Sequence, residues 1–250
     1  MRLAIYWAPP PGRLDDLAGR WLSGEDIGTT GLPRPQRDLV AAPARYGFHG
    51  TIKAPFRLAE GCSIATIESR MERLCASLAP VALPAMQLAC DAGFVALRPV
   101  APSEALARLA LAVVRHLDDL RAPLTATEIA RRRPESLSPR QRGNLDRWGY
   151  PHVAEDFRFH LTLTGPVDGA EGRAIVAALA PILQPALPRP FPIDRLCLFQ
   201  QPEGGRFRQI GVWVAGVMTM IFACSSALAG RSGAFGAEVH ATSASAALGL

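Results

Sequence analysis

The sequence predicts an α+β fold with an internal duplication. Two segments, residues 83–99 and 193–214, each contain two strand-forming runs separated by a turn, as β-hairpins do. Stretches with apolar residues at helical spacing lie between them. One eight-residue phrase occurs twice, at residues 48–55 and 159–166, with Phe, His, Thr and Pro at matching places. Hairpins imply antiparallel pairing, and together with helices they indicate the α+β class.

The first predicted strand covers residues 2–8 and ends at three consecutive prolines. A helix is predicted over 14–22, and a loop rich in glycine and proline continues to about residue 37. The strand of the first motif copy spans 46–56. A serine then caps a helix over 64–78, where apolar residues recur at helical spacing.

Two strands over 83–90 and 94–99, joined by a turn at 91–93, form the first hairpin. A helix over 103–120 again begins at a serine and carries its apolar residues on one side. Residues 121–150 differ in composition, because they are rich in arginine and are interrupted by prolines. We expect two short helices there, at one edge of the site.

The second half repeats the order of elements. It contains a motif strand over 157–166, a helix over 169–183, and a hairpin formed by 193–200 and 207–214. The sequence of motif strand, helix and hairpin therefore occurs in both halves, which indicates duplication of elements as well as of the phrase.

Each copy of the phrase has the period of two that a half-buried strand requires. One face is apolar, with Phe, Gly and Ile in the first copy and Phe, Leu and Leu in the second. The other face is polar and carries His49, Thr51 and Lys53 in the first copy and His160, Thr162 and Thr164 in the second. A His and a Thr two residues apart lie about 7 Å apart along a strand.

Two imidazoles across one site suit acid–base chemistry on a phosphate. One neutral imidazole acts as base and one imidazolium acts as acid, since an ordinary histidine pKa near 6.5 makes both states accessible. Thr51 and Thr162 donate hydrogen bonds to the non-bridging oxygens. Two alternatives stay open: a duplicated structural strand whose histidines do nothing, and a zinc site, although the usual third ligand is not visible. The predicted chemistry needs no metal and no cofactor.

The chain resembles the 2H phosphoesterase superfamily, which two His-x-Thr motifs define. That group includes RNA 2′,3′-cyclic phosphodiesterases and 2′-5′ RNA ligase-like proteins. The context at 45–56 and 157–165, with the stretches 130–134, 137–142 and 148–151, is similar to a bacterial branch often found with phosphonate-utilisation genes.

The resemblance implies two pseudo-symmetric lobes of antiparallel sheet, flanked by helices, around a central cleft. We expect one lobe at about 1–100, a helical insert at about 101–150 and the second lobe at about 151–214.

Four further residues are candidates for substrate binding. Lys53, the single lysine of the chain, shares the polar face of His49, and Thr164 holds the matching place in the second copy. Lys53 is equally consistent with a solvated lysine at a strand end. Tyr46 is a candidate to stack on a base or sugar, or equally to pack in the core, and Arg206 in the closing hairpin is a candidate to line the cleft. The run 131–133, with Arg140 and Arg142, is a candidate basic lip for phosphate or RNA, or a solvated helical face.

Composition favours an anionic ligand without demanding nucleic acid. The net charge is +5 and the pI is about 9.3. Five cysteines without paired spacing, and an N-terminus that enters a strand directly, predict reduced thiols in the cytoplasm.

Beyond about residue 215 the chain is rich in Ala, Ser and Gly and nearly uncharged. The apolar run at 210–224 is too short for a span of about 20 residues. We expect a poorly ordered tail over 215–250 and no membrane association, with a C-terminal anchor as the alternative.

The sequence therefore predicts a metal-independent phosphodiesterase that acts as a monomer on a 2′,3′-cyclic or related sugar cyclic phosphate. Its expected partner is a small phosphorylated substrate or an RNA end. The alternatives are a non-catalytic protein that binds RNA ends or a phosphorylated metabolite, and an enzyme that joins or processes RNA ends. A pure binding protein has no need of two titratable groups, which favours the enzyme.

Overall fold

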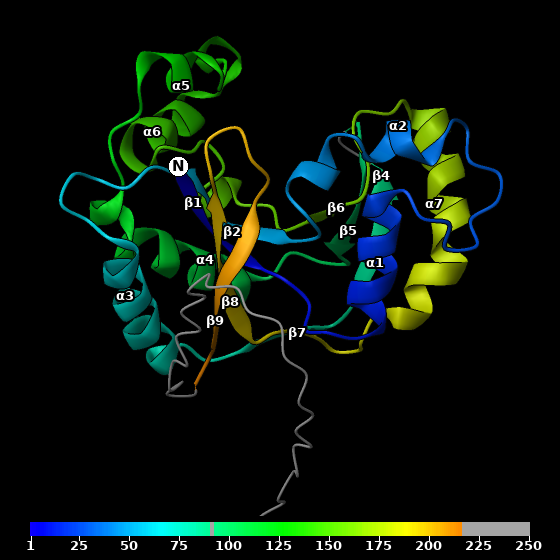
Figure 1. The fold of residues 1–250 in the computed structure, drawn as a ribbon, viewed down its shortest axis with the longest axis horizontal. Coiled ribbons are helices and arrows are strands. Elements are labelled where there is room, and N and C mark those ends of the chain that lie inside the picture. The colour runs from blue at the N-terminus through cyan, green and yellow to red at the C-terminus, as the bar shows by residue number, and fades with distance from the viewer. Residues whose placement is uncertain (91–92, 217–250) are drawn as a thin grey trace, which may run out of the picture. The chain divides into compact units, whose positions relative to one another are not determined.

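The computed structural model describes residues 1–90 and 93–216, whose fold is traced in Figure 1. It confirms the α+β prediction, because helices accompany strands that pair antiparallel throughout the described ranges. Within the described ranges, seven strands form one sheet in the order β4-β5-β6-β2-β1-β8-β9. Their bounds are β1 Arg2–Trp7, β2 Gly50–Phe56, β4 Met86–Cys90, β5 Val95–Pro99, β6 Leu161–Thr162, β8 Arg195–Gln201 and β9 Arg208–Val214. Two short strands, β3 Val81–Leu83 and β7 Phe191–Ile193, pair separately.

The predicted helices are found close to their expected limits. Ser63 and Ser103 cap their helices as predicted, since each hydroxyl accepts a hydrogen bond from the backbone N–H three residues later. The helix bounds are α1 Arg13–Ser23, α2 Gln36–Val40, α3 Ile64–Ser77, α4 Glu104–His116, α5 Ala126–Ala130, α6 Pro139–Trp148 and α7 Gly169–Leu183. Short 3₁₀ turns lie at 43–45, 118–120, 134–136, 154–156 and 184–186.

Both motif strands are shorter than predicted. The expected strand at 46–56 begins only at Gly50, because the chain turns at Gly47 with φ of 75° and joins the sheet afterwards. The strand expected at 157–166 is reduced to β6, which pairs with β2 at one position and with β5 at two. The alternating burial nevertheless holds in the second copy, where Phe159, Leu161 and Leu163 are buried.

The sheet brings the two copies of the motif together at its centre, since β2 and β6 are neighbours. The hairpin β4–β5 lies beside β6, and the hairpin β8–β9 lies beside β1. Each hairpin thus borders a strand from the other half of the sequence. The lobe limits at about 100 and 151 stay a prediction. The strand order shows, in addition, that strands from the two halves of the sequence pair with each other.

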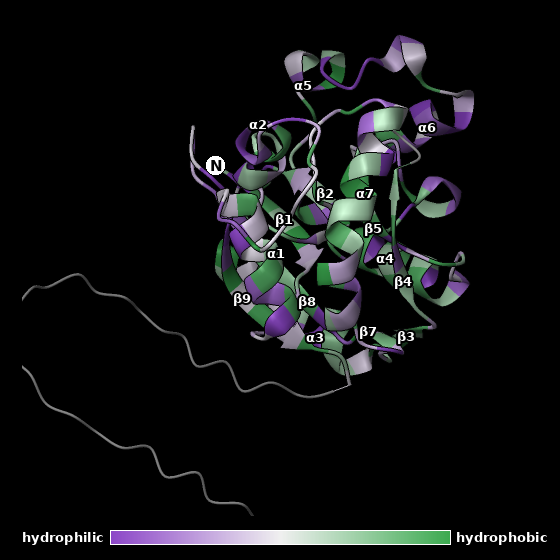
Figure 2. Cartoon of the chain, turned by 90° about the vertical axis from the view of Figure 1, so that its right-hand side faces the viewer, coloured by the Kyte–Doolittle hydropathy of each residue, from purple (hydrophilic) through white to green (hydrophobic). Residues whose placement is uncertain are grey.

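Helices cover both ends of this sheet. Contacts join α7 to β4 and β5, α4 to β2, and α3 to β9. The helices α5 and α6 belong to the predicted insert, and their ribbon in Figure 2 carries many residues in the hydrophilic colours. Arg140 of α6 binds Asp156 through two hydrogen bonds of 2.7 and 2.9 Å, which ties the insert to the chain just before the second motif copy.

None of the helices within the described ranges combines the length and the apolar content that a membrane crossing needs. The predicted tail lies, from residue 217 onward, outside the described residues, and so do two residues of the turn predicted at 91–93.

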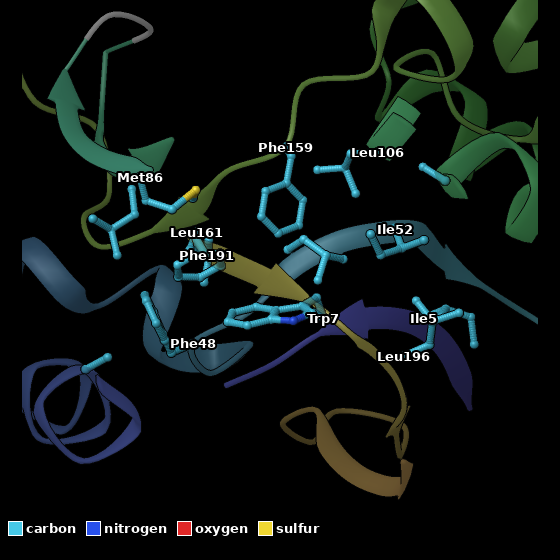
Figure 3. Close-up of a cluster of buried hydrophobic side chains, with 14 of the residues drawn as sticks. Ile5, Trp7, Phe48, Ile52, Met86, Leu106, Phe159, Leu161, Phe191 and Leu196 are labelled. Atoms are coloured by element: carbon cyan, nitrogen blue, oxygen red, sulfur yellow. The ribbon is translucent and has the colours of Figure 1, made fainter. Parts of the chain in front are cut away.

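Gly50 stands between the histidine and the threonine of the first copy, where the second copy has Leu161. The ring of Phe159 occupies the place that a Cβ on Gly50 would take. Figure 3 shows Phe159 in the buried cluster with Trp7 and Ile52, and its ring meets Trp7 edge to face at 6.4 Å. The two copies differ at this position because the aromatic ring of one copy packs on the backbone of the other.

We expect Gly50→Ala to lower the free energy of unfolding by about 1–3 kcal/mol, since the added methyl group must displace a packed ring. Urea unfolding measures the change. Gly143→Ala in α6 is the matched control, because a Cβ there meets nothing within 4 Å. A loss at Gly50 no larger than the change at Gly143 would contradict this packing.

Candidate active site

The two His-x-Thr motifs lie side by side in opposite directions, because β2 and β6 pair antiparallel. Gly50 is paired with Leu161. In that register His49 lies across from Thr162, and Thr51 lies across from His160. Each histidine is therefore next to the threonine of the other copy. A positive charge on His160 lowers the pKa of His49.

Both imidazoles are held in the same way. Nδ1 of His49 lies 3.0 Å from the carbonyl oxygen of Gly47, and Nδ1 of His160 lies 2.8 Å from that of Arg158. A carbonyl oxygen can only accept, so Nδ1 donates in both cases. The duplicated phrase thus fixes both imidazoles in the tautomer that carries its proton on Nδ1.

The surroundings of His49 favour its neutral form. Its ring stacks on Tyr6 with centroids 3.7 Å apart, and Phe199 lies at 6.3 Å. Burial among these rings lowers the pKa of His49 from 6.5 to about 4, although the Gly47 carbonyl acts in the opposite direction, and charge on His160 lowers it further. Burial also raises the pKa of Tyr6, so this phenol stays protonated. His49 is therefore an unprotonated base at neutral pH.

Two cavities meet at the motifs. The first cavity, of about 230 Å³, lies against β2, α4 and residues 148–158, and its lining includes Thr51, His160, Lys53, Arg121, Tyr150 and Phe157. The second cavity, of about 320 Å³, is lined by residues that include His49, Thr51, Thr162, Tyr46, Arg132 and Tyr150. Thr51 and Tyr150 border both. His160 and Thr51 thus line the first cavity, and His49 and Thr162 line the second. These are the pairs that the antiparallel register places opposite each other.

Lys53 is held in an ion pair. It is 3% exposed, and its Nζ lies 3.1 Å from Oδ1 of Asp118. Arg121 binds the same carboxylate through Nε at 3.0 Å. Burial lowers the pKa of Lys53 and the Asp118 charge opposes that shift. Irregular pairing places Lys53 opposite Ile5 and Thr51 opposite Tyr6. Lys53 still borders the first cavity, but its charge is balanced there.

The other candidates lie around the second cavity. Thr164 is 1% exposed, and its Oγ1 accepts a hydrogen bond of 2.9 Å from the Val95 N–H. Tyr46 is 38% exposed, stacks on Phe207 at 5.6 Å and stands at the rim. Arg206 is exposed and lines a third hollow that shares Tyr46 and Arg2 with the second cavity.

Sequence reasoning missed three residues that the structure brings to the site. Tyr6 lies in β1, and the sequence of that strand does not indicate that the ring of Tyr6 stacks on His49. Tyr150 and Arg132 lie in the insert, within the stretches that carry the family resemblance, where the arginine run predicts a basic lip or a solvated helical face. Among the described residues, no three or more His, Cys, Asp or Glu side chains are grouped so that they could hold a metal ion.

A model of the family described as "Protein of unknown function (DUF1045)" matches residues 51–208, more than half of the chain. The chain belongs to this family. The DUF1045 family is 2H phosphoesterase-like, so the predicted resemblance to that superfamily is confirmed.

Two curated relatives are both named ribose 1,5-bisphosphate phosphokinase PhnN. The protein from Laribacter hongkongensis (strain HLHK9) is 38% identical over 213 residues, which cover 82% of this chain and 49% of the relative. That from Janthinobacterium sp. (strain Marseille) is 38% identical over 184 residues, or 70% of this chain and 41% of the relative. This DUF1045 chain therefore spans at most about half the length of these relatives.

Two crystal structures of E. coli LigT, complexed with 3′-AMP and with NADP⁺, are also similar. Sequence identity is 11% and 14%, and the TM-scores are 0.39 and 0.36. Each match covers 86% of this chain and 96% of LigT. These TM-scores are too low to support an argument about this DUF1045 chain.

Proposed function

We propose that this protein hydrolyses a 2′,3′-cyclic or related sugar cyclic phosphate by two-histidine acid–base catalysis without a metal. One observation carries the proposal: two imidazoles, each with Nδ1 bound to a backbone carbonyl, line two cavities that share Thr51. Hydrolysis needs a base for the attacking water, an acid for the leaving oxygen and donors for the phosphoryl oxygens. The two motifs supply all of these.

His49 is assigned as the base, because its lowered pKa keeps Nε2 unprotonated at neutral pH. It takes a proton from water as the water oxygen bonds to phosphorus. The bond from phosphorus to the leaving sugar oxygen breaks, and His160 in its imidazolium form donates its Nε2 proton to that oxygen. Thr51 and Thr162 donate to the non-bridging oxygens. The product is a phosphomonoester beside a free hydroxyl.

The pH dependence of kcat/KM tests this assignment. The base acts only when neutral, so activity is expected to fall on the acid side as the pH approaches about 4. An ordinary histidine would place that fall near 6.5. The folded protein also binds a proton on His49 less readily than the unfolded chain, so the free energy of unfolding should decrease as pH falls from 6.5 to about 4. Circular dichroism at each pH separates the two effects, and an acid limb near 6.5 in folded protein would refute the assignment.

Binding roles for the remaining candidates follow from their positions. Tyr46 at the rim of the second cavity is proposed to cover the sugar, and Arg206 in the adjoining hollow is proposed to attract anionic substrates. Lys53 is proposed to act with Arg121 at the wall of the first cavity, and Thr164 to hold the motif strand against β5. These are smaller contributions than those of the two histidines.

Small phosphorylated sugars fit this site better than long RNA. The two cavities are about 230 and 320 Å³, which suits a compact ligand. The curated relatives carry names that concern a phosphorylated ribose. We therefore propose a ribosyl cyclic phosphate as substrate, a role in phosphonate metabolism, and a cytoplasmic monomer.

A panel of cyclic phosphates, followed by ³¹P NMR for the appearance of a phosphomonoester, tests the proposed reaction. Turnover of at least one sugar cyclic phosphate is expected. Tight binding of the panel without any turnover would instead support the binding protein. Joining of RNA ends, with no hydrolysis of the panel, would support the RNA-end enzyme.

A further inference from the structure

Arg132 reaches the active site from the insert. It follows α5, where its backbone N–H donates to the carbonyl of Ile129 at 2.9 Å. The next residue, Arg133, has the left-handed φ of 48°, so the chain turns sharply here. Arg132 lines the second cavity together with His49 and Thr162, whereas its neighbour Arg131 lines the third hollow. Two adjacent arginines of the run thus line different hollows.

The guanidinium of Arg132 is half-buried and rests on an aromatic ring. It lies 5.0 Å from the centroid of Tyr150, the tyrosine that borders both cavities. Its charge also acts on Tyr6 beneath His49. This cation–π contact holds the guanidinium beside Tyr150 at the wall of the cavity.

Within the described ranges, no hydrogen bond or ion pair joins the Arg132 side chain to another residue. Other arginines of this region are paired, such as Arg57 with Glu128 and Arg140 with Asp156. A cation that is partly removed from water without an acidic partner is unfavourable by itself. An anionic ligand in the second cavity would supply that partner.

Lys53, the cation expected from the motif itself, does not supply this charge. Its ammonium group is balanced by Asp118, whose carboxylate it shares with Arg121. His49 is neutral at neutral pH. Two arginines outside both motif copies, Arg2 and Arg132, bring the positive charge to the lining of the second cavity. Arg2 donates two hydrogen bonds to Gln201, at 2.9 and 2.6 Å, which leaves Arg132 as the better candidate to bind an anion beside His49.

We propose that Arg132 binds the non-bridging oxygens of the substrate phosphate and stabilises the negative charge that develops on them in the transition state. This inference deepens the proposed hydrolysis and rests on it. A guanidinium presents parallel N–H groups that match two phosphate oxygens, which an ammonium cannot do. Tyr150 is a positioning residue, because its ring holds the guanidinium at the cavity wall.

Kinetics of Arg132 variants test the role. Arg132→Ala is expected to lower kcat/KM by roughly 10²–10³-fold, mainly through kcat, as for the loss of one transition-state donor. Arg132→Lys should recover only part of this loss, and added guanidinium ion should partly restore Arg132→Ala. Tyr150→Leu should lower kcat/KM while Tyr150→Phe, which keeps the ring, should not. Arg142→Ala, an exposed arginine of α6, is the matched control. Equal kinetics for Arg132→Ala and Arg142→Ala in folded proteins would overturn the inference.

Inorganic phosphate separates this inference from the proposed reaction. Calorimetry should show that phosphate binds the wild-type protein at least about tenfold more tightly than it binds Arg132→Ala, as expected for a charged hydrogen-bond partner. That result without turnover of any cyclic phosphate would uphold the anion site and reject hydrolysis. Phosphate affinity unchanged by Arg132→Ala would overturn the anion site, whatever the activity.

Discussion

Replacement of either His49 or His160 by alanine is expected to lower kcat by about 10²–10⁴-fold, since each removes one of the two proton transfers. The two histidines act in one step, so the double variant should lose much less than the product of the single losses. Both effects should be in kcat more than in KM, because phosphate binding also depends on the threonines and Arg132. Steady-state kinetics on the best cyclic phosphate of the panel measures these changes.

His116→Ala is the matched control for the histidine variants. His116 is the last residue of α4 and lines neither cavity. Its replacement should leave kcat within a factor of about three, as expected for a side chain outside the reacting groups. If either motif variant retains turnover comparable with His116→Ala, two-histidine catalysis is wrong.

The second large effect concerns the free energy of unfolding. Asp118→Ala is expected to lower it by about 3–5 kcal/mol, because removal of one partner leaves a buried charge uncompensated. Lys53 is 3% exposed and has Asp118 as its acidic partner at 3.1 Å. Arg121 loses the same carboxylate. Burial acts to raise the pKa of Asp118, but Arg121 and Lys53 outweigh it and hold the pKa below its usual range, so the carboxylate is charged in the folded protein.

Urea unfolding of two further variants isolates this ion pair. Asp119→Ala removes the neighbouring aspartate, whose side chain is 58% exposed and pairs with Arg70. Its cost should be at most about 1 kcal/mol. Lys53→Met with Asp118→Leu removes the buried ammonium group together with its partner and should recover part of the loss from Asp118→Ala, since Arg121 still lacks the carboxylate. If Asp118→Ala and Asp119→Ala lower the free energy of unfolding equally, the buried ion pair of Lys53 with Asp118 contributes little to stability.

The sequence predicted those features that depend on residues close together in the chain, such as helix limits and the two faces of a strand. The helix at 169–183 was predicted with the limits it has, because apolar spacing and turn residues define it. The alternation of apolar and polar residues placed His160 and Thr162 on the face that lines the cavities. Repetition of the phrase indicated that the two copies belong to one site, and their central strands are neighbours in the sheet.

Features that depend on distant partners could not be predicted in this way. The acid that pairs with Lys53 lies 65 residues further along the chain. Gly50 is required by the ring of Phe159, which belongs to the other copy. Each hairpin pairs with a strand from the other half of the sequence, β5 with β6 and β8 with β1. The register between such distant strands cannot be predicted from either strand alone. Arg132 lines the second cavity with His49 and Thr162, although it is distant from both in sequence.

Hydrolysis of a sugar cyclic phosphate by metal-free wild-type protein tests the central claim most directly. The protein is dialysed against EDTA, the metal content is measured, and phosphomonoester formation is followed with EDTA present. Because the two imidazoles carry both proton transfers, the rate should equal that of undialysed protein and should not change when Mg²⁺, Mn²⁺ or Zn²⁺ is added. Turnover that vanishes in EDTA and returns with one of these ions would contradict catalysis by His49 and His160 alone.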